Sequence, residues 1–165
     1  MAETHPNGVP FTNDPETHDR IGNIKTDLND LAVSSHRHGV EFLEAARHLL
    51  MYMPEYGDVI GTNLAFACEL FLKSMLHSQG IKFRKEHNLE NLCRLLPNAQ
   101  QEEIRLRFKD VPLRESEDFN LILSEISHAF VFLRYIYERK KAVVDIGSLM
   151  GMACVLCSMI ELPER

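Results

Sequence analysis

The sequence predicts an all-α protein, an antiparallel bundle of about five main helices joined by short connections. In several long stretches, apolar residues recur at steps of three and four, the spacing that places side chains on one helix face. No alternating apolar and polar run is joined to another by a hairpin dipeptide, and no repeat occurs at the periods typical of solenoids. These observations favour a bundle without a sheet.

The strongest helical pattern covers residues 58–79, with an apolar stripe made by Leu64, Cys68, Phe71 and Met75. Gly80 is expected to end this helix, because glycine adopts the left-handed C′ conformation at little cost. Asn88 is the predicted N-cap of the next helix. The remaining periodicity and the prolines predict a short lead-in helix over 21–33, a helical piece over 100–109, and further main helices near 36–54, 88–96, 117–141 and 143–162.

The chain of 165 residues is expected to form a single domain preceded by a tail. Residues 1–20 carry three prolines and a glycine among polar residues, so they lack the apolar area that would offset their ordering entropy. We therefore expect residues 1–20 to be a flexible tail and residues 21–165 to form the helical domain.

Composition also bounds the compartment and the partners. Four cysteines without a secretory signal indicate a cytoplasmic protein with free thiols. A net charge of −6 argues against a protein that coats nucleic acid, although a local basic patch stays compatible with it. Residues 146–160 are free of lysine, arginine and glutamate and carry Gly147 and Gly151, but this run is too short to span a bilayer. We expect no membrane insertion there, and instead a buried core helix or a helix in a subunit interface.

No cofactor or metal is predicted. Glycine-rich phosphate loops, a nucleophile elbow and the His-Glu-x-x-His metal motif are all absent. Cys154 and Cys157 have the spacing of half a zinc site, but a tetrahedral site needs four ligands and no second pair lies near them in sequence. Core packing of these two thiols is the favoured interpretation.

The candidate site residues centre on Arg134 and Tyr135, which lie within an apolar run. An arginine in such a run cannot be buried unpaired, and Glu69 on the helix predicted over 58–79 is the expected partner. The first interpretation is a structural ion pair between two helices. The second is an anion or nucleotide site formed by Arg134, Tyr135, Lys73 and His87.

Two smaller features concern charge near this group. Glu69 and Lys73 have the spacing and order of a favourable i,i+4 ion pair. Arg84, Lys85 and His87 form a basic loop, which is either an ordinary solvated loop or a contact for a phosphate at the start of the helix that follows.

Three segments of the sequence share a known pattern: ACELFLKSML, HNLENLCRLL and AFVFLRYIYE, at residues 67–76, 87–96 and 129–138. Together they resemble the HEPN family (higher eukaryotes and prokaryotes nucleotide-binding), whose members are small helical bundles. They match the family in a helix that carries a glutamate and a lysine, in a His-x-Leu at the start of the next helix, and in an arginine–tyrosine segment of the fourth helix. The matching positions are Glu69, Lys73, His87, Arg134 and Tyr135.

The resemblance also shows a departure. HEPN ribonucleases share an arginine followed by a polar residue and a histidine about two turns downstream. In this chain Arg134 is followed by Tyr135, no histidine follows His128, and no other arginine has a histidine at that spacing. The family's ribonuclease residues therefore cannot be transferred, and no catalytic residue is assigned.

These features predict a non-catalytic binding module that takes a nucleotide, a nucleic acid or a partner protein. The apolar helix surface exceeds what a five-helix monomer needs, and this excess, together with Gly147 and Gly151, predicts a homodimer with the helix over 143–162 or the helix over 117–141 at its interface. The resemblance implies a prokaryotic defence or toxin–antitoxin setting and a nucleotidyltransferase as a partner. One alternative is an RNA endonuclease or nucleotide-modifying enzyme that uses His87, His128 and Arg134. A third is a purely structural dimerisation module.

Overall fold

The computed structural model describes residues 27–111, 118–134 and 145–160, and the expected tail at residues 1–20 lies outside them. The described residues form helices and no strand, which confirms the all-α bundle. The helices are α2 (Leu28–Leu49), the short 3₁₀ helix η1 (Leu50–Tyr52), α3 (Gly57–Ser78), α4 (Leu89–Leu95), α5 (Asn98–Lys109), α6 (Phe119–Ile126), α7 (Ala129–Arg134) and α8 (Ile146–Ser158).

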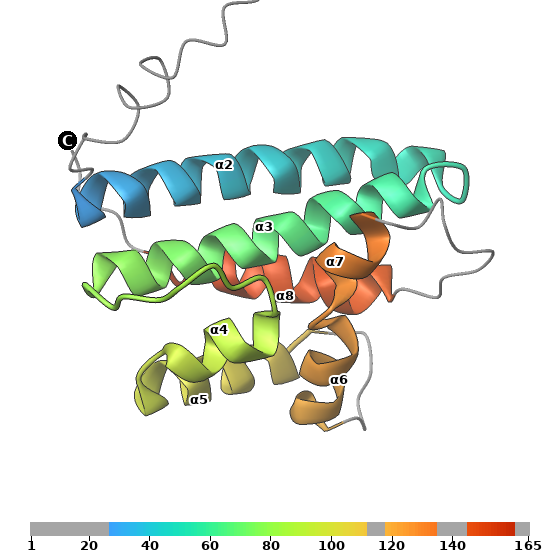
Figure 1. Ribbon diagram of the computed structural model, residues 1–165. Coiled ribbons are helices and arrows are strands. Elements are labelled where there is room, and N and C mark those ends of the chain that lie inside the picture. Colours follow the sequence, from blue (N-terminus) through green and yellow to red (C-terminus); the bar gives the residue numbers. More distant parts are fainter. Residues whose placement is uncertain (1–26, 112–117, 135–144, 161–165) are drawn as a thin grey trace, which may run out of the picture.

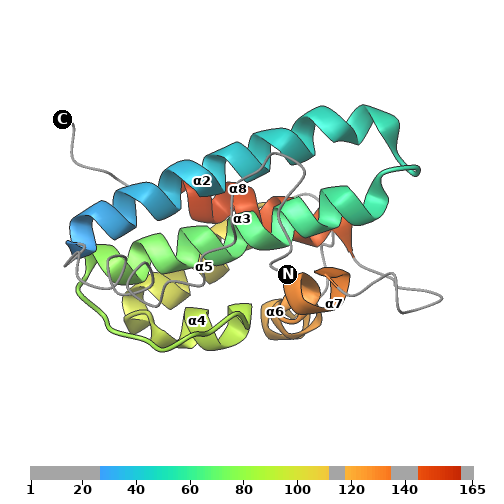
Figure 2. The same ribbon diagram turned by 45° about the horizontal axis from the view of Figure 1, so that its top comes forward.

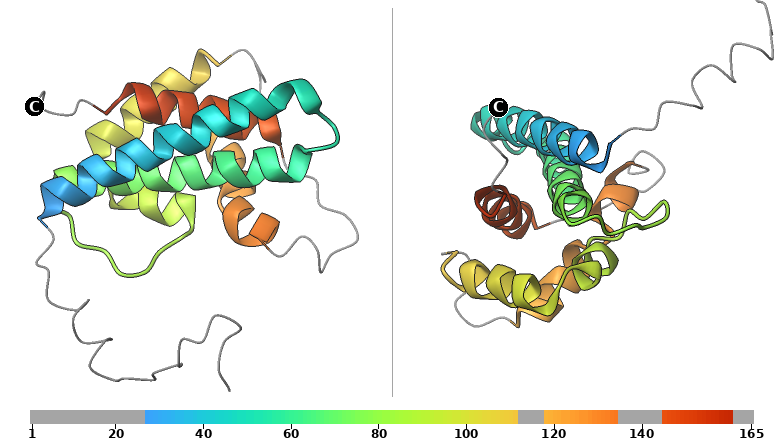
Figure 3. Two further views of the ribbon diagram at one scale, coloured as in Figure 1. Left: turned by 90° about the horizontal axis from the view of Figure 1, so that it is seen from above. Right: turned by 90° about the vertical axis from the view of Figure 1, so that its left-hand side faces the viewer.

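Helix α3 is the centre of the bundle. It runs antiparallel to α2, and it also packs against α8, α7 and α4 (Figure 1). Figure 3 shows α8 on one side of the α2–α3 pair, with α4 and α5 forming a further layer below. The stripe predicted from the sequence is buried, with Leu64, Cys68 and Phe71 fully enclosed and Met75 nearly so. The predicted helix of residues 58–79 is thus confirmed within one residue at each end.

Helix α3 is also, by length and composition alone, the one described helix that could cross a bilayer. Its most apolar window has a mean hydropathy of 1.4, but 67% of that window is buried inside the bundle. The helix is apolar on most faces because it has neighbours on most faces, which is the pattern of a core helix.

The separate lead-in helix expected over 21–33 is wrong in its described part. A single helix α2 runs from Leu28 to Leu49, and Asp27 caps it by accepting a hydrogen bond from the Asn29 N–H at 3.1 Å. No glycine or proline interrupts residues 33–36, so nothing in the sequence breaks the helix there. The helix ends earlier than expected, and η1 leads to Pro54.

The single helix expected over 117–141 is also wrong in its described part, because α6 and α7 are separated at Ser127 and His128. The Ser127 carbonyl accepts the Leu89 N–H at 3.2 Å and its hydroxyl oxygen accepts the Glu90 N–H at 3.0 Å. The break therefore supplies acceptors to the first turn of α4, whose N–H groups have no partner within their own helix. Figure 2 shows α6 beside the start of α4.

Helix α8 is a core helix of the chain itself. Leu149, Met152 and Leu156 are buried within the bundle. A Cβ atom at Gly151 would lie 2.6 Å from Val111 Cγ1, so this glycine permits close packing within one chain. The buried face of α8 is therefore unavailable as the subunit interface that the sequence suggested for it.

The contact between α2 and α3 yields a stability prediction. A Cβ atom at Gly39 would lie 2.6 Å from Phe71 Cε1, whereas a Cβ atom at Gly57 would meet nothing within 4 Å. Gly39→Ala should lower the free energy of unfolding by about 1–2 kcal/mol, because overpacking outweighs the better helix propensity of alanine. Gly57→Ala should leave it unchanged or raise it by about 0.5 kcal/mol. Urea denaturation measures both, and equal stability of the two variants would contradict this packing.

Candidate functional site

The candidate site is built around Glu69, a carboxylate in α3 whose side chain is 1% exposed. Its Oε1 atom accepts a hydrogen bond from Lys73 Nζ at 2.6 Å and another from His87 Nδ1 at 3.0 Å. Nδ1 of His87 carries the proton in this contact, since an ionised carboxylate can only accept. The i,i+4 pair expected between Glu69 and Lys73 is confirmed, and it is largely buried.

The two partners connect this buried charge to the surface. The Lys73 side chain is 18% exposed and the His87 side chain is 47% exposed. Within the described residues, the second carboxylate oxygen of Glu69, Oε2, is buried and has no hydrogen-bond partner. A buried acceptor without a partner is costly, so it needs an explanation such as a bound water, an ion or a catalytic role. The Glu69 carboxylate therefore orients the side chains of Lys73 and His87 through Oε1, and its Oε2 atom remains able to accept another hydrogen bond.

The loop that carries His87 is held at both ends. At the start, Gly80 takes a φ of +70° and the Ile81 N–H donates to the Leu76 carbonyl at 2.9 Å, which closes α3 as predicted. Near the end, the Glu86 carboxylate accepts the N–H groups of His87 and Asn88, each at 2.8 Å. The Asn88 N–H is the main reason why the pKa of Glu86 lies below its usual value. His87 thus reaches Glu69 from a fixed backbone.

The start of α4 does not offer the phosphate site that the basic loop suggested. Asn88 caps the helix as predicted, with its Oδ1 accepting the Asn91 N–H at 2.8 Å. Ser127 satisfies the N–H groups of Leu89 and Glu90. Because these donors are already used within the chain, a phosphate would have to be bound by side chains alone. Arg84 and Lys85 lie exposed on the same loop.

Of the remaining predicted site residues, only some lie in the part of the chain that the structure describes. His128 lies beside this group, with Asn88 Nδ2 3.2 Å from its Nε2 atom. Tyr135 and the side chain of Arg134 lie outside the described residues, so the Glu69–Arg134 pair stays a prediction. The described partners of Glu69 are Lys73 and His87. Ser127 could not be identified from the sequence, because a serine after a helical run is too common to indicate a helix break.

His77 extends the polar line of Glu69 and Lys73 by one more turn of α3. Its ring packs against Phe83 with ring centres 5.0 Å apart, and its buried Nδ1 has no hydrogen-bond partner within the described residues. Burial, with a smaller contribution from Lys73, lowers the pKa of His77. The His77 ring is therefore neutral, and it packs like an apolar side chain at the end of α3.

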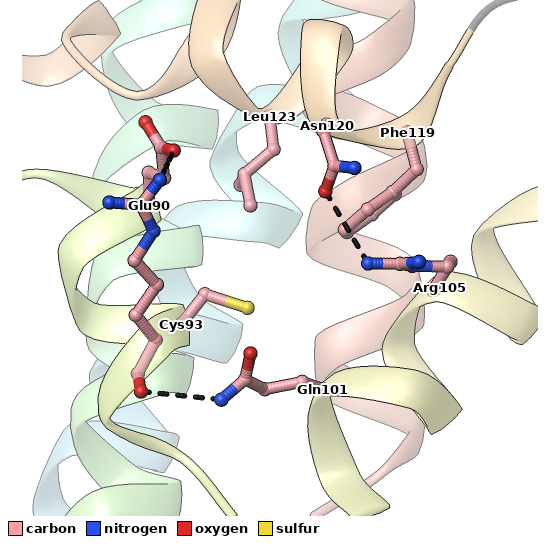
Figure 4. Close-up of a pocket in the computed structure, with 8 residues that line it drawn as sticks. Glu90, Cys93, Gln101, Arg105, Phe119, Asn120 and Leu123 are labelled. Atoms are coloured by element: carbon pink, nitrogen blue, oxygen red, sulfur yellow. Dashed lines mark hydrogen bonds and ion pairs between the residues drawn. The ribbon is translucent and has the colours of Figure 1, made fainter. Parts of the chain in front are cut away.

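A pocket of about 120 Å³ lies between α4, α5 and α6 (Figure 4). Sequence reasoning did not identify it. Arg105 donates to Asn120 Oδ1 at 3.4 Å and lies 5.9 Å from the Phe119 ring centre, while Arg94 pairs with Glu90. Cys93 faces the same pocket, and burial raises its pKa to about 11. Arg105 and Asn120 join α5 to α6, and Arg94 and Glu90 pair within α4. Each of these four side chains already has a partner within the chain, so this pocket is a weaker candidate than the Glu69 group.

Within the part of the chain that the structure describes, no three His, Cys, Asp or Glu side chains are placed to hold a metal ion. Cys154 and Cys157 pack against the core, as expected from the sequence. The Arg47 guanidinium donates to Cys154 Sγ at 3.4 Å, which further ties this thiol to helix packing between α2 and α8.

The burial of Glu69 yields a second stability prediction. Glu69→Ala should lower the free energy of unfolding by about 2–4 kcal/mol, because it removes charge-assisted bonds and leaves Lys73 near the core without a counter-ion. Glu103→Ala is the matched control, since Glu103 and Arg107 have the same i,i+4 order and a 2.6 Å contact but are each 45% exposed. It should cost about 0.5 kcal/mol. Similar losses for both variants, measured in urea, would show that burial adds nothing.

Histidine burial gives a pH prediction. Burial lowers the pKa of both His77 and His36 in the folded protein, whereas an unfolded histidine has a pKa of about 6.5. The unfolded chain therefore binds protons first, and stability is lost as the pH falls below about 6.5. The urea midpoint should drop between about pH 7.5 and about pH 5.5, with a smaller drop in His77→Leu. An unchanged drop in that variant would contradict the assignment.

The chain matches a family of known proteins over most of its length. The family model of the HEPN domain matches residues 32–153, from the first turns of α2 to α8. No curated protein and no solved structure matches the chain. The match covers most of the chain and includes Glu69, Lys73 and His87, the residues that meet around the buried carboxylate. The chain belongs to the HEPN domain family.

Proposed function

We propose that this HEPN domain binds a nucleotide or an RNA end through Lys73 and His87 and does not cleave it. The observation that carries the proposal is the buried Glu69 carboxylate, which holds an ammonium and an imidazole at the surface of α3. Lys73 is suited to phosphate by its charge. His87 can donate to a phosphate oxygen through Nε2 when its ring is doubly protonated, because Nδ1 already donates to Glu69. Arg134 and Tyr135 are the further ligand contacts that the sequence predicts.

One feature supports binding without cleavage, because the sequence lacks the arginine–histidine spacing of HEPN ribonucleases. Binding would also be local, because the chain has a net charge of −6 and cannot coat a polyanion. A defence or toxin–antitoxin setting with a nucleotidyltransferase partner rests on the family membership alone.

One observation favours the enzyme alternative. A carboxylate that accepts a hydrogen bond from Nδ1 of a histidine is the arrangement that orients a general base. His128 lies next to Asn88, so a second histidine is close to this pair. The alternative would make His87 and His128 an acid–base pair, with Arg134 neutralising phosphate charge.

The binding proposal is tested with a labelled single-stranded RNA of about ten nucleotides and with adenosine monophosphate. Lys73→Gln should weaken RNA binding about tenfold and reduce the slope of log affinity against log salt by about 1, because one phosphate contact is lost. Lys109→Gln makes the same charge change on α5, outside the Glu69 group, and should leave the affinity nearly unchanged. Fluorescence anisotropy measures both, after thermal melting has shown that each variant is folded.

His87→Ala separates binding from catalysis. If His87 contacts phosphate, the variant loses affinity and the parent protein leaves RNA intact. If His87 is a general base, the variant retains affinity and loses turnover. RNA cleavage by the parent protein that disappears in folded His87→Ala would contradict the binding proposal, as would equal RNA affinity of Lys73→Gln and Lys109→Gln.

We also propose a homodimer. Because the buried face of α8 packs inside the chain, α6 and α7 are the remaining described parts of the interface predicted over 117–141, and the Leu121 side chain on α6 is 63% exposed. Leu121→Ser should shift sedimentation at micromolar concentration from dimer towards monomer, since an interface of about 1,600 Å² depends on a few apolar contacts. Leu106→Ser, on α5, should not. A monomeric parent protein would contradict the proposal.

A further inference from the structure

Exposed apolar side chains gather at one end of the molecule. Nine large hydrophobic residues are exposed among the described residues, and six of them lie between residues 50 and 59. They surround η1 and the turn into α3, at the end of the α2–α3 pair (Figure 1). We call this surface the apolar tip, and it consists of Leu50, Met51, Tyr52, Met53, Tyr56 and Val59.

The composition of the apolar tip is that of a recognition surface. Met51 is 77% exposed, and the rings of Tyr52 and Tyr56 meet edge to face with centres 6.1 Å apart. Tyrosine and methionine are enriched at protein interfaces, where methionine adapts to an irregular partner and tyrosine provides a rigid contact. A single exposed apolar side chain needs no explanation, whereas a cluster of this kind marks an interaction site.

The charges at the apolar tip are acidic. Glu55 and Asp58 are exposed between its apolar residues. No lysine or arginine occurs between Arg47 and Lys73. Arg47 itself donates to Glu44 at 2.6 Å and to Cys154 at 3.4 Å. The apolar tip therefore combines exposed hydrophobic area with negative charge, and residues 48–72 contribute no lysine or arginine to it.

This charge pattern distinguishes between the possible binding partners of the apolar tip. Nucleic acid and anionic lipid both require lysine or arginine at the surface, and the segment has neither. A second copy docked tip to tip would bring like charges together in an isologous contact. An apolar protein face rimmed by lysine or arginine would bury the hydrophobic area and pair with Glu55 and Asp58.

We propose that the apolar tip is the docking surface for a partner protein that presents an apolar face with a basic rim. The site lies apart from the candidate nucleotide site, because Val59 and Glu69 are ten residues apart on α3, about 15 Å along the helix. The inference therefore stands independently of whether Lys73 and His87 bind phosphate.

The test uses a labelled helical peptide of about 18 residues with leucine on one face and lysine on the other, and a second peptide in which glutamate replaces lysine. The full chain should bind the lysine peptide, and Met51→Ser should weaken that binding about tenfold. The double variant Glu55→Lys, Asp58→Lys should weaken it as well and bind the glutamate peptide better than the parent does. Leu106→Ser removes an exposed leucine on α5 and should bind like the parent.

Each other outcome overturns the inference. No binding of the lysine peptide, equal binding of both peptides by the parent, or equal affinity of Met51→Ser and Leu106→Ser would do so. Stronger binding to vesicles rich in phosphatidylserine than to the lysine peptide would point to a membrane. A change in sedimentation of Met51→Ser would assign the apolar tip to a second copy. Met51, Glu55, Asp58 and Leu106 are all exposed, so each variant should remain folded, and a thermal melt of each variant separates lost binding from unfolding.

Discussion

A charged carboxylate enclosed in a helix bundle has to be paired, and this constraint on Glu69 determines how the candidate site is built. Lys73 provides one partner for the Glu69 carboxylate from the same helix, one turn further on. His87 provides the second partner from a position 18 residues further along the chain, so the loop after α3 must return along α3. The ion cluster thus fixes the path of the chain from α3 to α4, and the same contacts hold two phosphate-compatible side chains at the surface.

A second constraint acts through Ser127. The first N–H groups of α4 need acceptors, and Ser127 provides a carbonyl and a hydroxyl where α6 ends. This contact holds His128 beside Asn88 and directs α7 back along α3, where Leu133 would lie 3.0 Å from a Cβ atom at Gly61. The loop with His87, the start of α4 and the α6–α7 break are therefore one connected unit. A change in any of them should move the others.

Local sequence signals predicted the parts of the fold that local forces decide. The stripe of α3, its glycine stop at Gly80 and the Asn88 cap depend on near neighbours, and all three are confirmed. Periodicity could not reveal the break at Ser127, because Ile122, Ile126 and Leu133 continue the apolar spacing on both sides of it. The spacing of Glu69 and Lys73 predicted their pair but not its burial. The contact with His87 depends on tertiary packing, which no local pattern encodes.

Glu69 should be energetically coupled to both Lys73 and His87. Double-mutant cycles in urea measure this directly, with Glu69→Gln combined in turn with Lys73→Met and with His87→Ala. We expect a coupling energy of about 1–3 kcal/mol in each cycle and about zero in a control cycle with Lys109→Met. Additivity within about 0.5 kcal/mol in both test cycles would contradict it, because the buried carboxylate would then not depend on these partners.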